Sequence, residues 1–339
     1  MRIHISKIYG YIGTGAKRQE TVAAIAKRDL HYDELGIYRY QVESDTPEML
    51  GTRLDGILAS VYHGDIVIIQ SPTWNGLDFE ETLMRHLYAY RDLGKIIFIH
   101  DVPPLMSESY RPQLQRYIDY YNQADLVIVP SRKMLDVLRE HGLMVKKTVI
   151  HKMFDYVASA DETIKPVFRK VVNLAGNPNS DPELEFCRDW KSDNVQLAVT
   201  ADGGDWAHGK NIGFLGWFKN DNSLVNALRK SGGFGLLWSV NFSGTEYNKI
   251  NAPYKLSVCL AAGLPVVVPV GIAEQDTVIR KNLGFAAATL EEAADMIEHM
   301  KEEEYRNMAE NVGRFSYLLR EGFFTRKALT DAVFQLLGG

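Results

Sequence analysis

A histidine and an aspartate stand side by side where an apolar run of residues ends. The run Lys95–His100 reads Lys-Ile-Ile-Phe-Ile-His, and Asp101 and two prolines follow it closely. Such a run predicts a strand buried on both faces of a parallel sheet, and ligands bind beyond the carboxyl ends of these strands. We therefore expect His100 and Asp101 to be catalytic, either positioning a substrate or taking its proton. A structural histidine is the alternative.

A lysine in the first turn of a predicted helix indicates an anion site. Residues 251–255 read Asn-Ala-Pro-Tyr-Lys, and proline suits the start of a helix. A cation at that end opposes the helix dipole unless an anion lies beside it, and free amide groups there bind phosphate. We expect Asn251, Tyr254 and Lys255 to bind a diphosphate. The alternative is a solvated surface lysine.

A glycine-rich turn follows the first predicted strand. Residues 9–15 read Tyr-Gly-Tyr-Ile-Gly-Thr-Gly, which matches neither the dinucleotide fingerprint nor a P-loop. Glycine lets a ligand approach the backbone where a helix begins. We expect Gly13, Thr14 and Gly15 to lie beside such a ligand. A tight strand-to-helix turn is the alternative.

Polar and aromatic residues also follow other predicted strands. Residues 70–75 read Gln-Ser-Pro-Thr-Trp-Asn, and their hydroxyl, amide and aromatic groups suit a sugar ring. In the second half of the chain, an aromatic residue after the third strand could hold a planar base. We expect Ser71, Thr73, Trp74 and Asn75 to contact a sugar, and Asn177, Asn179, Gly216 and Trp217 to contact a ligand that carries a planar base.

Composition argues against several other classes of protein. Lys and Arg (38) are fewer than Asp and Glu (43), so the net charge of −5 and the lack of a long basic run argue against nucleic acid as a partner. Two cysteines cannot form a disulfide framework, and Cys259 lies in an apolar stretch that predicts burial. No serine-nucleophile elbow, His-x3-His pair or Asp-x-Asp motif is present. We expect neither a metal nor a cofactor.

The N-terminus reads as a strand and not as a signal peptide. No apolar run approaches the roughly 20 residues that cross a bilayer. We therefore expect a cytoplasmic protein.

Short apolar runs alternate with longer amphipathic ones, which predicts parallel sheets with crossover helices. A length of 339 residues favours two domains of roughly 150 residues each. In the first half, the predicted strands are Ile3–Ile8, Leu35–Tyr40, Asp65–Gln70, Lys95–His100, Leu126–Pro130 and Thr148–Lys152, with helices at 16–30, 46–62, 78–93, 108–122 and 131–141. In the second half, they are Lys170–Ala175, Gln196–Thr200, Ile212–Leu215, Phe234–Ser239, Pro265–Pro269 and Phe285–Ala287, with helices at 181–190, 221–231, 252–262, 273–282, 290–300, 302–320 and 324–337.

The pattern weakens into a polar stretch near 155–167, which we interpret as a linker. The expected architecture is α/β, with two Rossmann-like domains facing across a cleft. The first domain covers residues 1–160 and the second, nucleotide-sugar-binding domain covers 161–320. The segment 321–339 is expected to form a helix that packs back on the first domain.

These segments resemble glycosyltransferases of the GT-B fold. His100-Asp101-Val-Pro-Pro resembles their His-Asp-x-x-Pro segment, whose histidine reaches the donor sugar, and residues 261–266 resemble their Ala-x-Gly-x-Pro-Val stretch. More narrowly, the chain resembles the bacterial glucosyltransferase family that adds the second sugar, onto O-linked N-acetylglucosamine, of serine-rich repeat adhesins. The segments that carry this narrower resemblance are 1–10, 70–75, 100–104, 232–238 and 253–255, and it extends over essentially the whole chain.

That resemblance implies a UDP-sugar donor, with glucose as the first choice of hexose, a glycan or glycopeptide acceptor, no metal, and a homo-oligomer such as a tetramer. It also implies that residues 13–15 lie near the donor, that Asn251 and Lys255 contact UDP, and that Gly216 and Trp217 lie on the uracil side. With this resemblance, we expect the donor side to include Gly15, Asn177, Asn179 and Tyr254 as well. The residues expected on the acceptor side are Gly13, Thr14, Ser71, Thr73, Trp74 and Asn75.

The chain departs from many retaining GT-B enzymes at several positions. Ile250 and Val258 stand where those enzymes have a Glu–x7–Glu pair, and Asn177 and Asn179 stand where they have Arg and Lys. Lys255 is left as the principal phosphate cation.

Other functions stay open at this point. Related enzymes of polysaccharide assembly transfer galactofuranose or N-acetylglucosamine. A catalytically silent GT-B-like subunit could bind a glycan, and a two-domain epimerase or binding protein could use a similar crevice.

Overall fold

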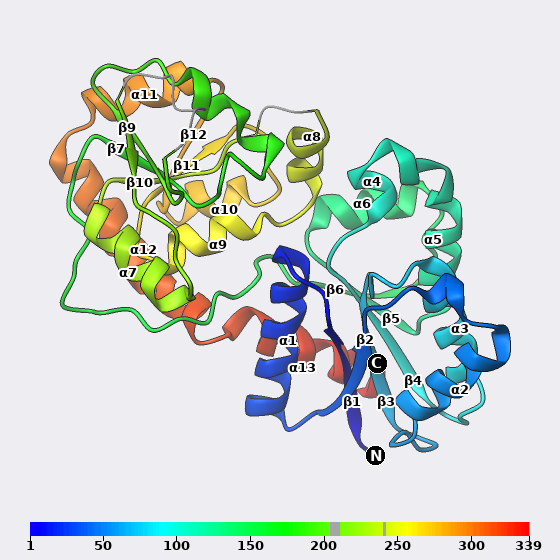
Figure 1. The fold of residues 1–339 in the computed structure, drawn as a ribbon. Coiled ribbons are helices and arrows are strands. Elements are labelled where there is room, and N and C mark those ends of the chain that lie inside the picture. Colours follow the sequence, from blue (N-terminus) through cyan, green and yellow to red (C-terminus); the bar gives the residue numbers. More distant parts are fainter. Residues whose placement is uncertain (204–210, 240–241, 339) are drawn as a thin grey trace. The chain divides into compact units, whose positions relative to one another are not determined.

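The computed structural model describes residues 1–203, 211–239 and 242–338, which form two compact units (Figure 1). The first unit comprises Met1–Lys152 together with Phe324–Gly339, and the second comprises Met153–Phe323. The domain boundaries predicted from the sequence lie at residues 160 and 320.

Within the described part of the first unit, six strands form one parallel sheet in the order β2-β1-β3-β4-β5-β6. Every residue of β3 and β5 is buried, because helices cover both faces of the sheet. The strands are β1 (Ile3–Tyr9), β2 (Asp33–Tyr38), β3 (Ile66–Ser71), β4 (Gly94–Ile99), β5 (Leu126–Val129) and β6 (Lys147–Ile150).

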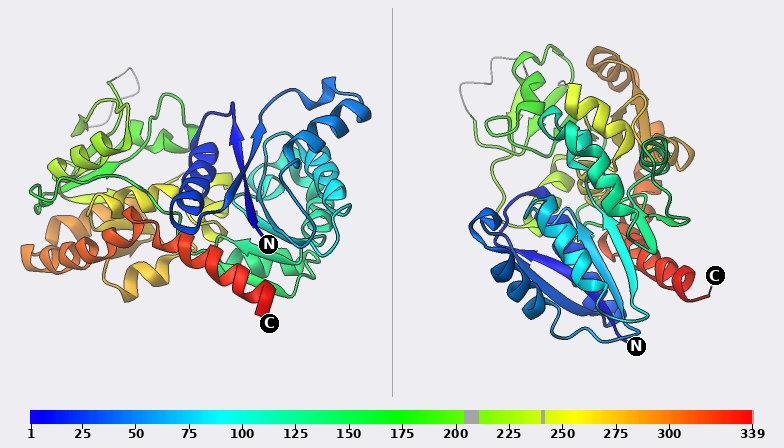
Figure 2. Two further views of the ribbon diagram at one scale, coloured as in Figure 1. Left: turned by 90° about the horizontal axis from the view of Figure 1, so that it is seen from below. Right: turned by 90° about the vertical axis from the view of Figure 1, so that its right-hand side faces the viewer.

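The helices of the first unit are α1 (Thr14–Leu30), α2 (Pro47–Ile57), α3 (Leu77–Leu87), α4 (Pro103–Met106), α5 (Leu114–Tyr121) and α6 (Arg132–Glu140). The last helix, α13 (Phe323–Gly338), lies along this unit (Figure 2). Thr325 Oγ1 is 3.3 Å from His151 Nε2, Lys147 Nζ donates to Leu336 O at 3.3 Å, and Arg326 pairs with Asp29 at 3.6 Å. These contacts attach the end of the chain to β6 and α1.

The second unit repeats the plan with a parallel sheet of six described strands in the order β12-β11-β10-β7-β8-β9. The strands are β7 (Val171–Leu174), β8 (Gln196–Val199), β9 (Ile212–Phe214), β10 (Phe234–Leu236), β11 (Val266–Pro269) and β12 (Gly284–Ala287). The helices are α7 (Asp221–Ser231), α8 (Phe242–Ile250), α9 (Tyr254–Ala261), α10 (Gln275–Arg280), α11 (Leu290–His299) and α12 (Glu302–Arg320).

All of the strands predicted from the sequence are present, with small shifts of their ends. The predicted helix at 181–190 is present as a 3-10 helix over Pro182–Asp189. The predicted helix at 108–122 is an α-helix only from Leu114, because Pro112 lies inside a preceding 3-10 turn. Helix α8 was not predicted, since its Ser, Gly, Thr and Asn residues are weak helix formers.

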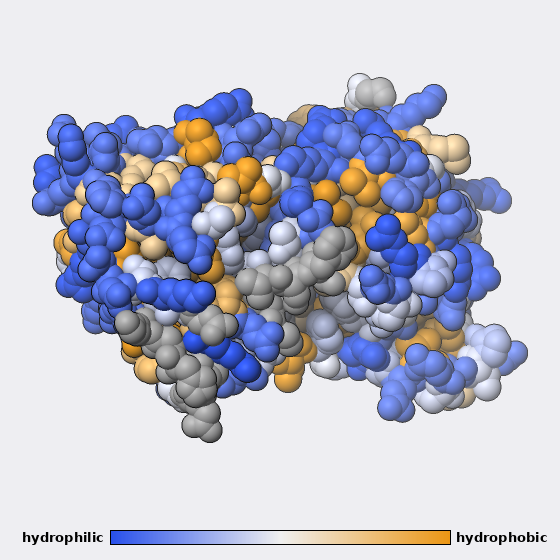
Figure 3. All heavy atoms as spheres, turned by 90° about the horizontal axis from the view of Figure 1, so that it is seen from above, coloured by the Kyte–Doolittle hydropathy of each residue, from blue (hydrophilic) through white to orange (hydrophobic). Residues whose placement is uncertain are grey.

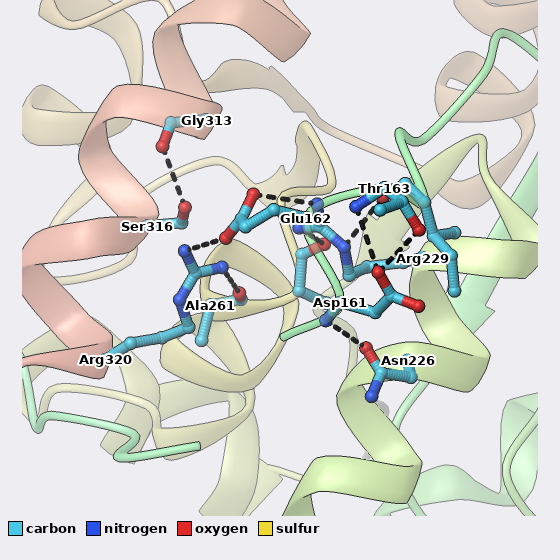
Figure 4. A network of polar contacts seen from close by, with 11 residues as sticks. Asp161, Glu162, Thr163, Asn226, Arg229, Ala261, Gly313, Ser316 and Arg320 are labelled. Atoms are coloured by element: carbon cyan, nitrogen blue, oxygen red, sulfur yellow. Dashed lines mark hydrogen bonds and ion pairs between the residues drawn. The ribbon is translucent and has the colours of Figure 1, made fainter. Parts of the chain in front are cut away.

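The polar stretch that we interpreted as a linker is bound to the second unit (Figure 4). Glu162 pairs with Arg229 of α7 at 3.2 Å and with Arg320 of α12. Arg320 also donates to Ala261 O in α9 at 3.2 Å, and Asp161 N donates to Asn226 Oδ1 at 2.8 Å. The stretch therefore ties three helices together.

Polar side chains cover most of the surface seen from above, with apolar residues in smaller groups between them (Figure 3). Cys187 and Cys259 are both buried and free, which confirms the expected burial of Cys259. No helix in the described ranges has the length and apolar character needed to cross a membrane.

The start of β12 depends on a glycine. Gly284 has a φ of 154°, and a Cβ there would overlap the carbonyl oxygen of Val266, its partner in β11. We predict that Gly284→Ala lowers the free energy of unfolding by roughly 2–4 kcal/mol. Urea unfolding measures this change.

The control is Gly313→Ala inside α12, where nothing lies within 4 Å of the added methyl group. This variant should stabilise the protein by about 0.5–1 kcal/mol. Equal unfolding midpoints for the two variants would contradict the steric explanation.

Candidate functional site

A buried polar network lies at the carboxyl ends of β1, β3 and β4. His100 follows β4, its side chain has no exposed surface, and its ring stacks on Phe98 with centroids 4.6 Å apart. Its Nε2 is 2.8 Å from Oε1 of Gln70, which lies in the neighbouring strand β3. Gln70 therefore fixes the orientation of the imidazole.

The hydrogen bonds of Gln70 also determine where the imidazole proton lies. Gln70 Nε2 donates to the carbonyl oxygens of Ser6 (2.5 Å) and Gln19 (3.1 Å), so its Oε1 must accept from His100 Nε2. Burial, Arg18 and His151 hold the pKa of His100 well below its ordinary value of about 6.5. The neutral ring thus has its proton on Nε2 and its basic lone pair on Nδ1.

Asp101 forms a buried ion pair with Arg18 of α1. The two residues are 2 % and 7 % exposed, so water hardly screens this pair. Asp101 thereby holds a cation beside His100, and the sequence analysis did not select Arg18. The catalytic roles expected for His100 and Asp101 stay predictions.

A second buried carboxyl group holds the turn after β3. Ser71 Oγ donates to Glu80 Oε2 at 2.6 Å, and Thr73 donates to Oε1 through its amide (2.6 Å) and its hydroxyl (3.2 Å). Glu80 is 1 % exposed, and burial raises the pKa of its carboxyl group. Asn75 accepts from Tyr40 N and donates to Tyr38 O.

Ser71, Thr73 and Asn75 are buried, and their side chains form these hydrogen bonds within the first unit. They therefore hold the turn in place. Glu80, which organises the turn, was missed by the sequence analysis. The expected acceptor-side role of the three residues remains a prediction.

Trp74 lies against the glycine-rich start of α1. Its indole stacks on Tyr11 with centroids 5.0 Å apart, and a Cβ on Gly15 would come within 3.0 Å of the ring. Gly15 is therefore needed for the close approach of Trp74. Gly13, with a φ of 132°, and Thr14 are exposed beside them. The structure brings these four predicted residues together with Tyr11.

In the second unit, Lys255 lies in the first turn of α9, as predicted. Its Nζ is 3.0 Å from Asp181 Oδ2, and the two side chains are 30 % and 34 % exposed. A Cβ on Gly176 would be 3.7 Å from Lys255 Cε. The start of α9 and the loop after β7 therefore lie side by side, and Asp181 is a partner that the sequence analysis missed.

The predicted asparagines shape the backbone around this lysine. Asn177 Oδ1 accepts from Asn179 N at 3.0 Å, which closes a turn in the loop after β7. Asn251 is 4 % exposed, and its Oδ1 accepts from Ala252 N at 2.8 Å just before α9. The ring of Tyr254 packs on Tyr156, with centroids 5.5 Å apart.

Gly216 and Trp217 follow β9 at the edge of the same sheet. Gly216 has a φ of 82°, and Trp217 is 67 % exposed. One strand separates β9 from β7, so about 10 Å lie between the two strand ends. The end of β9, which Trp217 follows, is therefore separated from the loop beside Lys255 by the width of the intervening strand β8.

Comparisons with known proteins cover almost the whole chain. Residues 2–153 match the family model described as "Glucosyltransferase 3-like, N-terminal domain", and residues 172–332 match the corresponding C-terminal domain. The chain is 39 % identical to glucosyltransferase 3 of Streptococcus parasanguinis (99 % of each chain) and 38 % identical to that of Streptococcus gordonii (99 % of this chain and 100 % of the relative).

Among solved structures, the chain is similar to Anabaena Alr3699/HepE, crystallised with UDP and glucose. The TM-score is 0.66 at 12 % identity, over 99 % of this chain and 100 % of that one. This likeness confirms the expected fold of two parallel sheets flanked by helices.

The hydrogen bond between Gln70 and His100 can be tested by spectroscopy. We predict that ¹⁵N NMR of the imidazole shows His100 neutral near pH 6, with its proton on Nε2. Gln70→Glu places a carboxylate beside this N–H, favours the charged ring, and should therefore raise the pKa of His100.

The control is Gln115→Glu, the same change at an exposed position of α5. It should leave the His100 signals unchanged. A proton on Nδ1 in the wild type, or the same His100 pKa in all three proteins, would contradict this assignment.

Proposed function

The chain belongs to the glucosyltransferase 3-like family of GT-B glycosyltransferases, and we propose that it transfers glucose from UDP-glucose to a glycan acceptor. The proposed acceptor is O-linked N-acetylglucosamine on a serine-rich protein. Lys255 at the start of α9, beside the loop after β7, is the observation that carries this proposal.

The proposed catalytic effect is stabilisation of the leaving diphosphate. Negative charge develops on this group as the bond to the sugar breaks, and a fixed cation lowers the energy of that transition state. Lys255 and the N-terminal end of α9, where the helix dipole is positive, supply positive potential at one place. Asp181 is about one-third exposed, so its ion pair with Lys255 is weak and a diphosphate, which carries more charge, can replace it.

The remainder of the donor would extend toward the sheet edge. The exposed indole of Trp217 offers a flat face for the uracil ring. Asn177 and Asn179 lie in the loop after β7, whose Gly176 approaches Lys255. This arrangement supports a nucleoside diphosphate as the donor group.

The first unit supplies the proposed acceptor site. Tyr11 and Trp74 form an aromatic surface beside Gly13 and Thr14, and the C–H faces of a sugar pack well on such rings. His100 has no exposed surface, so in this proposal it positions the acceptor side through its hydrogen bond to Gln70. Its pKa keeps the ring neutral, so it does not act as an acid.

We include independence from metal ions in the proposal, because Lys255 can supply the positive charge at the leaving group. Among the described residues, no group of three or more His, Cys, Asp or Glu side chains could hold a metal ion. The expected cytoplasmic location and the homo-oligomeric state, such as a tetramer, stay predictions.

A donor and acceptor screen tests the proposed reaction. The purified chain should transfer sugar from UDP-glucose to a serine peptide carrying N-acetylglucosamine, and mass spectrometry of the peptide detects the added hexose. UDP-galactose, UDP-galactofuranose and UDP-N-acetylglucosamine serve as competing donors, and excess EDTA should leave the rate unchanged.

Preference for UDP-galactofuranose or UDP-N-acetylglucosamine would favour enzymes of polysaccharide assembly instead. Conversion of the UDP-sugar without an acceptor would indicate an epimerase. Binding without transfer or hydrolysis would indicate a non-catalytic subunit.

Two opposite substitutions test the phosphate site. Lys255→Ala should raise the Kd for UDP about tenfold or more, which corresponds to about 1.4 kcal/mol, and should also lower kcat. Asp181→Asn removes the competing carboxylate and should lower the Kd for UDP. Calorimetric titration with UDP measures both.

Lys249→Ala is the matched control, since Lys249 also pairs with a carboxylate, Glu246, but lies in α8. Its Kd for UDP should equal that of the wild type. Unchanged UDP binding in Lys255→Ala would remove the lysine from the phosphate site.

A further inference from the structure

The first unit contains a half-open cavity of about 230 Å³ that the proposed reaction does not use. Helices α2 and α3 lie side by side (Figure 1). The cavity is lined by the end of α2, the turn before β3, and the end of α3 with the residues that follow it. Tyr62 and Tyr90 of this wall precede β3 and β4, whereas Ser71 and His100 stand at the carboxyl ends of these strands. A strand of this length spans about 20 Å, so the cavity is remote from His100.

Two aromatic rings give the cavity flat apolar faces. Tyr90 donates from its hydroxyl to Leu58 O at 3.3 Å, which fixes its ring. The ring of His63 lies 6.1 Å from that of Tyr90, and Tyr62 is 59 % exposed at the rim. Faces of this kind pack against the C–H groups of a sugar ring.

The polar groups of the wall include both donors and acceptors. Arg91 N donates to His63 Nδ1 at 2.7 Å, so neutral His63 has its own proton on Nε2 and is a donor there. His86 Nδ1 is 3.2 Å from Asp55 Oδ1, so this contact does not use the Nε2 atom of His86. The Asp55 side chain is 77 % exposed, so its carboxylate can accept further hydrogen bonds.

Size and charge restrict the ligand to one small, neutral, hydroxyl-rich ring. At roughly 30 Å³ per water, the cavity has the room of about eight waters, and it is smaller than the 300–1,000 Å³ typical of sites for drug-sized ligands. The residues that line it include Asp55 and no Lys or Arg, which disfavours a phosphate inside the cavity. The guanidinium of Arg2 lies outside this lining, over the ring of Tyr62 at 5.1 Å. Sugar hydroxyls, which both donate and accept, match the groups present.

We propose that this cavity is a second, non-catalytic sugar site that binds one monosaccharide of the acceptor glycoprotein. The choice of ligand rests on the proposed function, in which the acceptor is a serine-rich protein carrying many sugars. Binding one sugar there while another reacts raises the effective concentration of the remaining acceptor groups. The site would therefore act only on acceptors with several sugars.

Direct binding tests the cavity without any donor. Methyl β-N-acetylglucosaminide and methyl β-glucoside are titrated at millimolar concentrations into the ¹⁵N-labelled chain. We expect the imidazole signals of His63 and His86 to shift, and the shifts to vanish in the double variant Asp55→Asn/Tyr62→Ala. Both substitutions are at exposed side chains, so the fold should be kept.

Tyr88→Ala is the matched control, since Tyr88 is 56 % exposed near the same turn but does not line the cavity. It should keep the wild-type shifts. Absence of shifts in the wild type with both sugars, or equal shifts in the double variant, would overturn the proposal.

A kinetic comparison then tests the role of the site. The double variant should lose roughly tenfold or more in kcat/KM on a long acceptor with many sugars, and stay within about twofold of the wild type on a peptide with one sugar. An equal loss on both acceptors would overturn the proposed role. Failure of the wild type to transfer glucose would contradict the proposed function. The binding measurement would then show by itself whether the cavity binds a sugar.

Discussion

Covering a parallel sheet on both faces leaves polar side chains few places except the ends of the strands. In the first unit, β3 and β5 are entirely buried, and the functional candidates stand where neighbouring strands end. His100 follows β4, Ser71 ends β3, and the glycine-rich turn follows β1. In the second unit, the loop after β7 and the turn after β9 hold the corresponding positions. The location of both candidate sites follows from this single constraint.

Polar groups that remain buried need partners, and these partners fix the geometry of the sites. Gln70 uses both ends of its amide, so that His100 has one orientation and one tautomer. Glu80 similarly gathers the hydroxyl and amide groups of the turn after β3. In the second unit, Asn173 donates from β7 to the carbonyl oxygens of Gly232 and Phe234 at 2.7 and 3.0 Å. Such networks hold groups in place before a ligand arrives, because an alternative arrangement would leave a buried group unpaired.

The sequence allowed prediction of the strands and of the residues at their ends, because apolar runs and turn residues are local signals. It did not allow prediction of the residues that form hydrogen bonds or ion pairs with them. Gln70 and His100 are 30 positions apart, Lys255 and Asp181 are 74 apart, and Arg18 and Asp101 are 83 apart. No local pattern indicates such pairs, which arise only when the strands and helices pack. Arg18 and Glu80 stand among the buried residues of α1 and α3. A polar residue at a position that helical spacing assigns to the apolar face was the signal available for them in the sequence.

The two ion pairs at the candidate sites differ in what a ligand can do to them. Arg18 and Asp101 are almost fully buried, and removing one partner of such a pair costs about 3–5 kcal/mol, because the other charge stays behind without water. Lys255 and Asp181 are each about one-third exposed, where an ion pair contributes roughly 0–1 kcal/mol. A diphosphate can therefore replace Asp181 at Lys255, whereas no ligand of ordinary affinity separates Arg18 from Asp101. In the proposed reaction, the anion bound to Lys255 is exchanged on the donor side, whereas the ion pair between Arg18 and Asp101 on the acceptor side stays intact.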